Sequence, residues 1–138
     1  MTIQFLDMRT SQDGGGALVA ATSRLIGDIG LQTAGVSAAN AGSVRVQLWG
    51  YAKVAQTAAG DTVTVTIQRN GATIFSTTLT ARTALEQNYI AIDPADFPPA
   101  AAVLAGQIRY TMTIVSSAAA TLEDAGLGGE AVAGNFTG

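Results

Sequence analysis

The chain has 138 residues, enough to bury a hydrophobic core and most simply one domain, but only 12% of them are charged, about half the usual share of roughly 25%. It contains no Cys and no His, which excludes disulfides, thiolate zinc sites, Cys nucleophiles and Ser-His-Asp triads. The net charge of −3 argues against nucleic acid as a partner. No apolar run approaches ~20 residues, which argues against a membrane-spanning segment. We also expect no cofactor.

The first 16 residues predict an N-terminal arm and a hinge. Thr2 to Met8 is a short strand-like run, and Gly14, Gly15 and Gly16 follow it with unrestricted backbone angles. We therefore divide the chain into an arm, residues 1–16, and a domain, residues 17–138. The arm residues expected to dock on a neighbouring copy are Met1, Thr2, Ile3, Gln4, Phe5, Leu6, Asp7 and Met8. We expect no secretory signal, because MTIQFLDMRTSQ lacks a basic segment followed by an apolar core.

The next segment, Ala17 to Gln32, has a mixed pattern. Some of its apolar residues have a helical spacing, but Gly27 and Gly30 disfavour a long helix, so we expect one or two extended segments. Thr33 to Gly42 is small and polar and is predicted to be a loop.

The clearest strand runs from Ser43 to Val54, where apolar and polar residues alternate. This alternation places Val44, Val46 and Leu48 on the inner face and Trp49 and Tyr51 on the outer face. Gly50 within the run suggests a bend or a bulge.

A hairpin follows this strand. Thr62 to Arg69 alternates between Val or Ile and Thr or Gln, and Ala72 to Thr80 is the expected return strand. Asn70-Gly71 between two such runs predicts a type I′ turn, which needs a positive φ at both positions.

The C-terminal third predicts shorter elements. Gln87 to Asp93 is a strand, Asp93 to Pro99 is a loop because its three prolines lack N–H donors, and Gln107 to Val115 is a strand. Ala118 to Gly129 is expected to be a loop with a helical turn at 121–124, and Glu130 to Thr137 a closing strand. Seven to nine short strands at this spacing predict an all-β fold, an antiparallel β-sandwich or jelly roll.

No constellation of residues indicates catalysis, so we expect no enzyme. The acidic residues are scattered, and no calcium-loop spacing surrounds Asp93 with Asp96 or Glu123 with Asp124. Trp49 and Tyr51 have two interpretations: a platform for carbohydrate or another partner, or packing against another strand or subunit, which we favour. We expect ordinary ion pairs for the arginines of the strands.

Several motifs together resemble a known family. These are SVRVQLWGYAKV, TVTVTIQRNGATIFSTTL, DPADFPPAA, QIRYTMTIVSS and the terminal Phe136-Thr137-Gly138. In this order they resemble the C-terminal domains of bacterial spore-surface (exosporium) collagen-like glycoproteins, which have a jelly roll similar to complement C1q and tumour necrosis factor. The chain has no Gly-X-Y tract, and its arm also resembles that of endospore appendage subunits, although it lacks their Cys.

The resemblance implies a C1q/TNF-like jelly roll that assembles as a homotrimer or as a fibre at a bacterial spore or cell surface. We therefore expect a structural subunit whose partner is itself, with arm addition to a neighbour's sheet edge as one route of assembly. The alternative is a carbohydrate- or receptor-binding jelly roll, for example of a phage fibre, that uses Trp49 or Tyr51.

Overall fold

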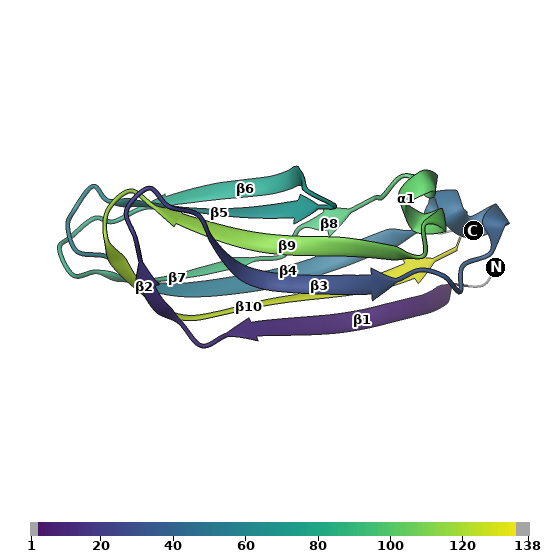
Figure 1. Ribbon diagram of the computed structural model, residues 1–138, viewed down its shortest axis with the longest axis horizontal. Helices are drawn as coiled ribbons and strands as arrows, with labels where there is room; N and C mark the ends of the chain where they lie inside the picture. Colours follow the sequence, from purple (N-terminus) through teal and green to yellow (C-terminus); the bar gives the residue numbers. More distant parts are fainter. Residues whose placement is uncertain (1–2, 135–138) are drawn as a thin grey trace.

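Two antiparallel sheets pack face to face in the computed structural model, which describes residues 3–134 (Figure 1). The first sheet has the order β1 (Gln4–Asp13), β10 (Ala120–Ala133), β4 (Arg45–Ala55) and β7 (Gln87–Ile92), with β2 (Gly16–Leu18) also paired with β10 and β8 (Ala95–Asp96) also paired with β4. The second sheet has the order β3 (Arg24–Gln32), β9 (Gln107–Ser116), β5 (Thr62–Arg69) and β6 (Ala72–Thr80). Two short helical segments, η1 (Ala38–Ser43) and α1 (Ala100–Leu104), lie at one end of the sandwich. Eight main strands in two four-stranded layers, with most neighbours distant in sequence, form a jelly roll, which confirms the predicted fold class.

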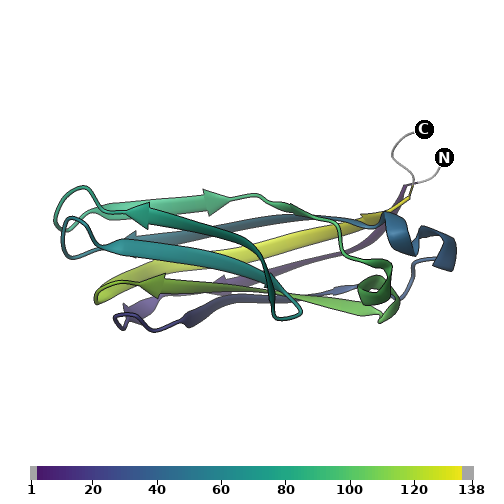
Figure 2. The ribbon, with the colours of Figure 1, turned by 90° about the horizontal axis from the view of Figure 1, so that it is seen from above.

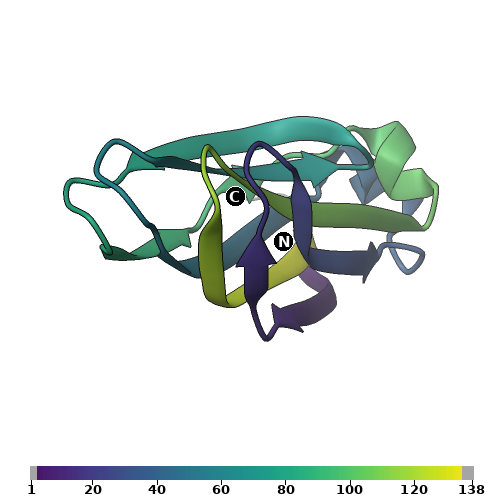
Figure 3. The same ribbon diagram turned by 60° about the vertical axis from the view of Figure 1, so that its left-hand side comes forward.

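The core lies between the two sheets and follows the predicted alternation. The inward residues of β4, β5 and β9 are fully buried, among them Leu48, Val65 and Met112. The Asn70-Gly71 turn has φ values of 48° and 88°, as a type I′ turn requires. The segment predicted as one or two extended pieces contains β2 and β3. In the turned view of Figure 3, the end of the sandwich that carries β2 comes forward.

Strand β10 corrects the predicted loop at Ala118 to Gly129. It is the longest strand, with 14 residues, and it pairs with β1 and β2 on one side and with β4 on the other. Its glycines lower its intrinsic strand propensity, but strands on both sides hold its backbone. The glycines also allow close packing, because a Cβ on Gly129 would lie 2.9 Å from side-chain atoms of both Ile29 and Leu48.

Two smaller expectations also need correction. The loop predicted for Asp93 to Pro99 contains β8, which pairs with Val46 and Gln47 between the flanking prolines. No register shift occurs at Gly50 in β4, where we expected a bend or bulge. Gly50 instead leaves room for Met112, whose sulfur would lie 2.9 Å from a Cβ at that position.

The N-terminal segment is a strand of the jelly roll in this chain. Gln4–Asp13 forms β1 and pairs along its length with β10, whereas Met1 and Thr2 lie outside the described residues. The boundary expected at residue 16 therefore does not separate two units here. Whether β1 also exchanges onto a neighbouring copy stays a prediction.

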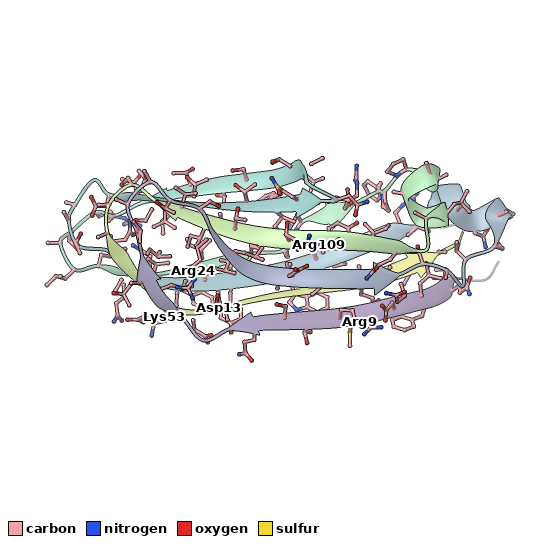
Figure 4. The ribbon with its side chains drawn as sticks, in the orientation of Figure 1. Arg9, Asp13, Arg24, Lys53 and Arg109 are labelled. Carbon is pink, nitrogen blue, oxygen red and sulfur yellow. The ribbon has the colours of Figure 1, made fainter. Side chains whose placement is uncertain are left out.

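Gly14 and Gly15 form the turn between β1 and β2, and Gly16 begins β2. Side-chain hydrogen bonds fix the conformation of this turn. Gly15 has a φ of 96°, and its N–H donates to an Asp13 carboxylate oxygen at 2.8 Å. The Arg24 guanidinium donates to Asp13 at 3.0 Å and to the Gly15 carbonyl at 3.1 Å, and Figure 4 shows Arg24 and Asp13 together beside this turn. These bonds tie the turn to the start of β3.

A buried polar cluster links the two sheets beside β8. The Asp96 carboxylate accepts hydrogen bonds from the Arg69 guanidinium at 2.7 and 2.9 Å and from the Tyr110 hydroxyl at 2.7 Å. Asp96 belongs to the first sheet, and Arg69 and Tyr110 to the second. Burial and the hydrogen bond to Asp96 raise the pKa of Tyr110 well above its ordinary value, so the folded state holds a neutral phenol.

We expect Tyr110→Phe to lower the free energy of unfolding by about 1–2 kcal/mol, because the buried carboxylate of Asp96 loses a donor. Urea denaturation at neutral pH measures this loss. The exposed Tyr89 provides the control: Tyr89→Phe should change stability by less than about 0.5 kcal/mol.

The raised pKa of Tyr110 also predicts a dependence of stability on pH. The neutral phenol contributes its full stability below the ordinary pKa of about 10, and this contribution falls as the pH rises above that value, because the unfolded phenol ionises first. Denaturation from pH 8 upward should show a steeper alkaline loss in the wild type than in Tyr110→Phe. Equal slopes in the two proteins would contradict this assignment.

Candidate functional site

The outer face of the first sheet carries the exposed aromatic residues expected from the alternation of β4. Trp49 is 37% exposed and Tyr51 is partly buried, so the structure confirms that both face outward. Tyr89 of the neighbouring strand β7 is 64% exposed and stacks on Tyr51, with ring centroids 5.8 Å apart and planes at 14°. Three aromatic side chains from two strands therefore form one group, which we call the aromatic platform: Trp49, Tyr51 and Tyr89.

Two glycines of β10 provide the space for this platform. Gly128 pairs with Trp49 and Gly126 pairs with Tyr51 across the strands. The Trp49 indole occupies the position where a side chain of Gly128 would stand, and a Cβ on Gly126 would lie 2.6 Å from the Tyr51 ring. The Trp49 and Tyr51 rings therefore lean over β10.

Beyond the glycines, β1 forms the opposite wall of a shallow trough. Thr10 pairs with Gly128 and Gln12 pairs with Gly126, so their side chains share the outer face. The Gln12 amide donates to the Tyr51 hydroxyl at 3.3 Å across the trough. The resulting cavity has a volume of about 280 Å³ and is lined by Thr10, Ser11, Gln12, Trp49, Tyr51, Gly126 and Leu127.

Further polar groups lie beyond Tyr51, toward the end of the sheet that carries β2. The Tyr51 hydroxyl donates to Asp124 at 3.1 Å, and Lys53 forms an ion pair with Glu123 at 3.1 Å. Glu123 also accepts a hydrogen bond from the Gln87 amide at 2.9 Å. The trough lining thus combines aromatic rings with hydroxyl and amide groups, and the Asp124 carboxylate bonds to its Tyr51 hydroxyl.

The other residues singled out in the sequence are distributed elsewhere. Arg69 and Arg109 form the expected ion pairs, with Asp96 and Asp28, both at 2.7 Å. The Arg45 guanidinium lies over the Phe97 ring, 4.8 Å from its centroid. Residues 3–134 contain no group of three acidic residues placed to hold a metal ion, and no helix in that range is long and apolar enough to cross a membrane.

A second hollow lies on the outer face of the other sheet. It has a volume of about 490 Å³ and is lined by Leu25, Gln68, Asn70, Gly71, Arg109, Thr111 and Thr113. The charge of Arg109 is already matched there by Asp28. The hydrogen bond that the Arg109 guanidinium donates lowers the pKa of the Asp28 carboxyl below its usual range. We therefore regard the aromatic trough as the better candidate site.

The trough contains residues that the sequence pattern did not single out. Its lining beside Trp49 and Tyr51 is completed by Thr10, Ser11, Gln12, Gly126 and Leu127. Tyr89 of β7 stacks on Tyr51 outside the lining. One local signal was available: glycines at 126 and 128 have the same two-residue spacing as the aromatic residues at 49 and 51. The matching spacing predicts that the glycines face the aromatic residues only once β10 is known to pair with β4.

Comparison with known proteins supports the fold alone. No protein-family model matches the sequence, and no curated protein is similar to it. Among solved structures, the T13 particle of infectious bursal disease virus matches with a TM-score of 0.52 and 12% identity, covering 91% of this chain and 35% of the viral chain. The VP2 subviral particle of the same virus matches with a TM-score of 0.51 and 10% identity, covering 91% and 36%. The carbohydrate-binding module CBM36, solved with calcium and xylotriose, matches more weakly, with a TM-score of 0.43, 14% identity and coverage of 91% and 98%.

This chain spans about a third of each viral chain. Both of those matches have TM-scores above 0.5, and they agree with the jelly roll read from the strand order. Identities this low establish a shared architecture and nothing about what the chain binds.

We expect Gly128→Ala to displace the Trp49 indole, because the added methyl group would occupy the same space. The emission of Trp49, the single tryptophan, should shift to the red, and stability should fall by about 1–3 kcal/mol. Gly42→Ala is the matched control, since nothing lies within 4 Å of a Cβ at that position. Unchanged emission in Gly128→Ala would show that the ring does not lie over β10.

Proposed function

We propose that this chain is a non-catalytic structural subunit that assembles with copies of itself. The observation that carries the proposal is the open edge of strand β6. Its nine residues, ATIFSTTLT, include no charged residue and no proline. β6 pairs with β5 on one side, and none of the described backbone hydrogen bonds outside the sheets involves a residue of β6.

Such an edge is unusual because edge strands normally carry features that prevent pairing with other chains. Natural edges are short, charged, interrupted by proline or covered by another segment. β7, the edge strand of the other sheet, also lacks charge, with the sequence QNYIAI. The strand orders put β6 and β7 at corresponding ends of the two sheets, opposite the contacting pair β1 and β3, so both uncharged edges are on one side, which we call the open side. In Figure 2, β7 lies along the upper margin of the sandwich and the C-terminal end of β6 lies near it.

The opposite side, along β1 and β3, is closed. Asp7 of β1 accepts a hydrogen bond from the Gln32 N–H at 2.8 Å, and Ser11 accepts one from the Asp28 N–H at 3.2 Å. Side chains of one sheet thus cover backbone donors at the edge of the other. The contrast between the closed and open sides indicates that the open side is kept available for a partner.

A strand from another copy would satisfy the free N–H and C=O groups of the open side by β-augmentation. The low charge of the whole chain favours the same outcome, since charged residues are depleted at the centre of protein interfaces. The expected products are a homotrimer or a filament. The resemblance to spore-surface glycoproteins and appendage subunits supports a bacterial spore or cell surface as the setting.

Two lysines on the β6 edge should prevent assembly. Thr73 and Thr80 are exposed, and Thr73→Lys with Thr80→Lys would place charges beside any added strand. Light scattering and negative-stain microscopy should show oligomers for the wild type and monomers for the double variant. Ala34→Lys with Ala39→Lys adds the same charge at exposed positions between β3 and β4 and should assemble normally. A wild type that is monomeric at every concentration would refute the proposal.

A second experiment separates edge pairing from exchange of the N-terminal strand. Met8 pairs with Glu130 across β1 and β10, and the chain has no Cys, so Met8→Cys with Glu130→Cys places one pair of thiols at disulfide range. We expect oxidised assemblies to run as single chains on a non-reducing gel, because β1 stays on its own domain. A ladder of covalently linked chains would instead show that the arm couples neighbouring subunits.

A further inference from the structure

We propose that the trough over β10 binds one sugar ring of a neutral glycan. The inference does not rest on self-assembly, because the trough lies on the outer face of the first sheet, whereas the proposed assembly uses the open side. It rests on the aromatic platform, the glycine floor and the polar groups around them.

The apolar part of the site comes from Trp49 and Tyr51. A pyranose ring presents C–H groups on one face and hydroxyls around its rim, so it needs an aromatic surface flanked by hydrogen-bonding groups. Trp49 is held over Gly128, yet 37% of it remains exposed, so part of the indole is available for contact. Tyr51 is fixed by Gln12, Asp124 and Tyr89, which reduces the entropy lost when a ligand binds.

The polar part of the site matches hydroxyl groups. Thr10 and Gln12 lie on the wall opposite the aromatic rings, and Asp124 lies at one end. Threonine hydroxyls, amides and carboxylates together offer donors and acceptors for a hydroxyl ligand. The cavity of about 280 Å³ is near the lower end of small-molecule sites, about 300 Å³, which suits one ring.

The charge around the trough selects a neutral ligand. Lys53 is already paired with Glu123, and Asp124 adds a negative charge beside Tyr51. A phosphate or an acidic sugar would meet carboxylates without a free cation among these groups, and the chain as a whole carries −3. Neutral hexoses and pentoses are therefore favoured over nucleotides and uronic acids.

The experiment uses the full chain and a panel of neutral oligosaccharides: cellohexaose, xylohexaose, mannohexaose and chitohexaose. Trp49 is the only tryptophan, so its emission reports directly on occupancy of the trough. We expect one of these sugars to shift that emission and to give saturable heat in isothermal titration. A uronic acid oligomer should produce no response.

Two surface variants test whether the aromatic platform carries the binding. Trp49→Ala should weaken binding by at least about tenfold. Tyr89→Ala should weaken it less, because Tyr89 acts through its stacking on Tyr51. Phe97→Ala is the matched control, since Phe97 is 63% exposed, against 64% for Tyr89, but lies over Arg45 away from the trough. It should bind as the wild type does.

The outcomes separate this proposal from the assembly proposal. The titrations are repeated with the Thr73→Lys and Thr80→Lys variant, which should keep full sugar binding even if it no longer assembles. If no sugar in the panel binds the folded protein at millimolar concentration, the glycan proposal is refuted. If Trp49→Ala changes the oligomeric state while no sugar binds, the platform is a contact between copies, which also refutes it.

Discussion

Close packing over the glycines of β10 is the constraint on which the rest of the structure depends. Gly129 faces the core and leaves room for Ile29 and Leu48, so the two sheets approach closely there. Gly126 and Gly128 face outward and leave room for Tyr51 and Trp49. One strand therefore determines both the separation of the layers and the position of the aromatic platform, because at these positions it lacks the side chains that would keep its neighbours apart.

Several of the few charged residues of this chain lie at junctions between strands. Asp7 bonds the edge of β3, Asp13 and Arg24 hold the turn between β1 and β2, and Asp96 joins β8 to β5 and β9. Removing one member of a buried pair leaves the other unsatisfied, which costs more than the pair contributes when intact. None of these charges lies in β6 or β7, and the proposed assembly depends on the neutrality of those two edge strands.

Local alternation of apolar and polar residues was sufficient to predict β4, β5 and β9, and the Asn70-Gly71 turn predicted β6 as the return strand of a hairpin. It failed for β10, whose glycines and acidic residues resemble a loop and whose strand conformation depends on partners more than 60 residues away in sequence. The outward direction of Trp49 and Tyr51 was predictable. The trough was not, since its other wall comes from β1, which the sequence pattern assigned to a separate arm. Asp96 was likewise read as one of several scattered charges, because its partners Arg69 and Tyr110 meet it only across the sandwich.

The placement of both uncharged edges on one side limits the symmetry of any assembly. Subunits that meet through a self-complementary pairing of that side form a closed complex, whereas a head-to-tail pairing of β6 with β7 closes only if its rotation completes a ring. The outside of such a ring would present β1 and β3, whose charged residues and covered backbone groups oppose further growth. Growth of a closed ring into a fibre would need a second, different contact, and the release of β1 from its own sheet would create one. A short ring and a long filament would then be successive levels of organisation of the same chain.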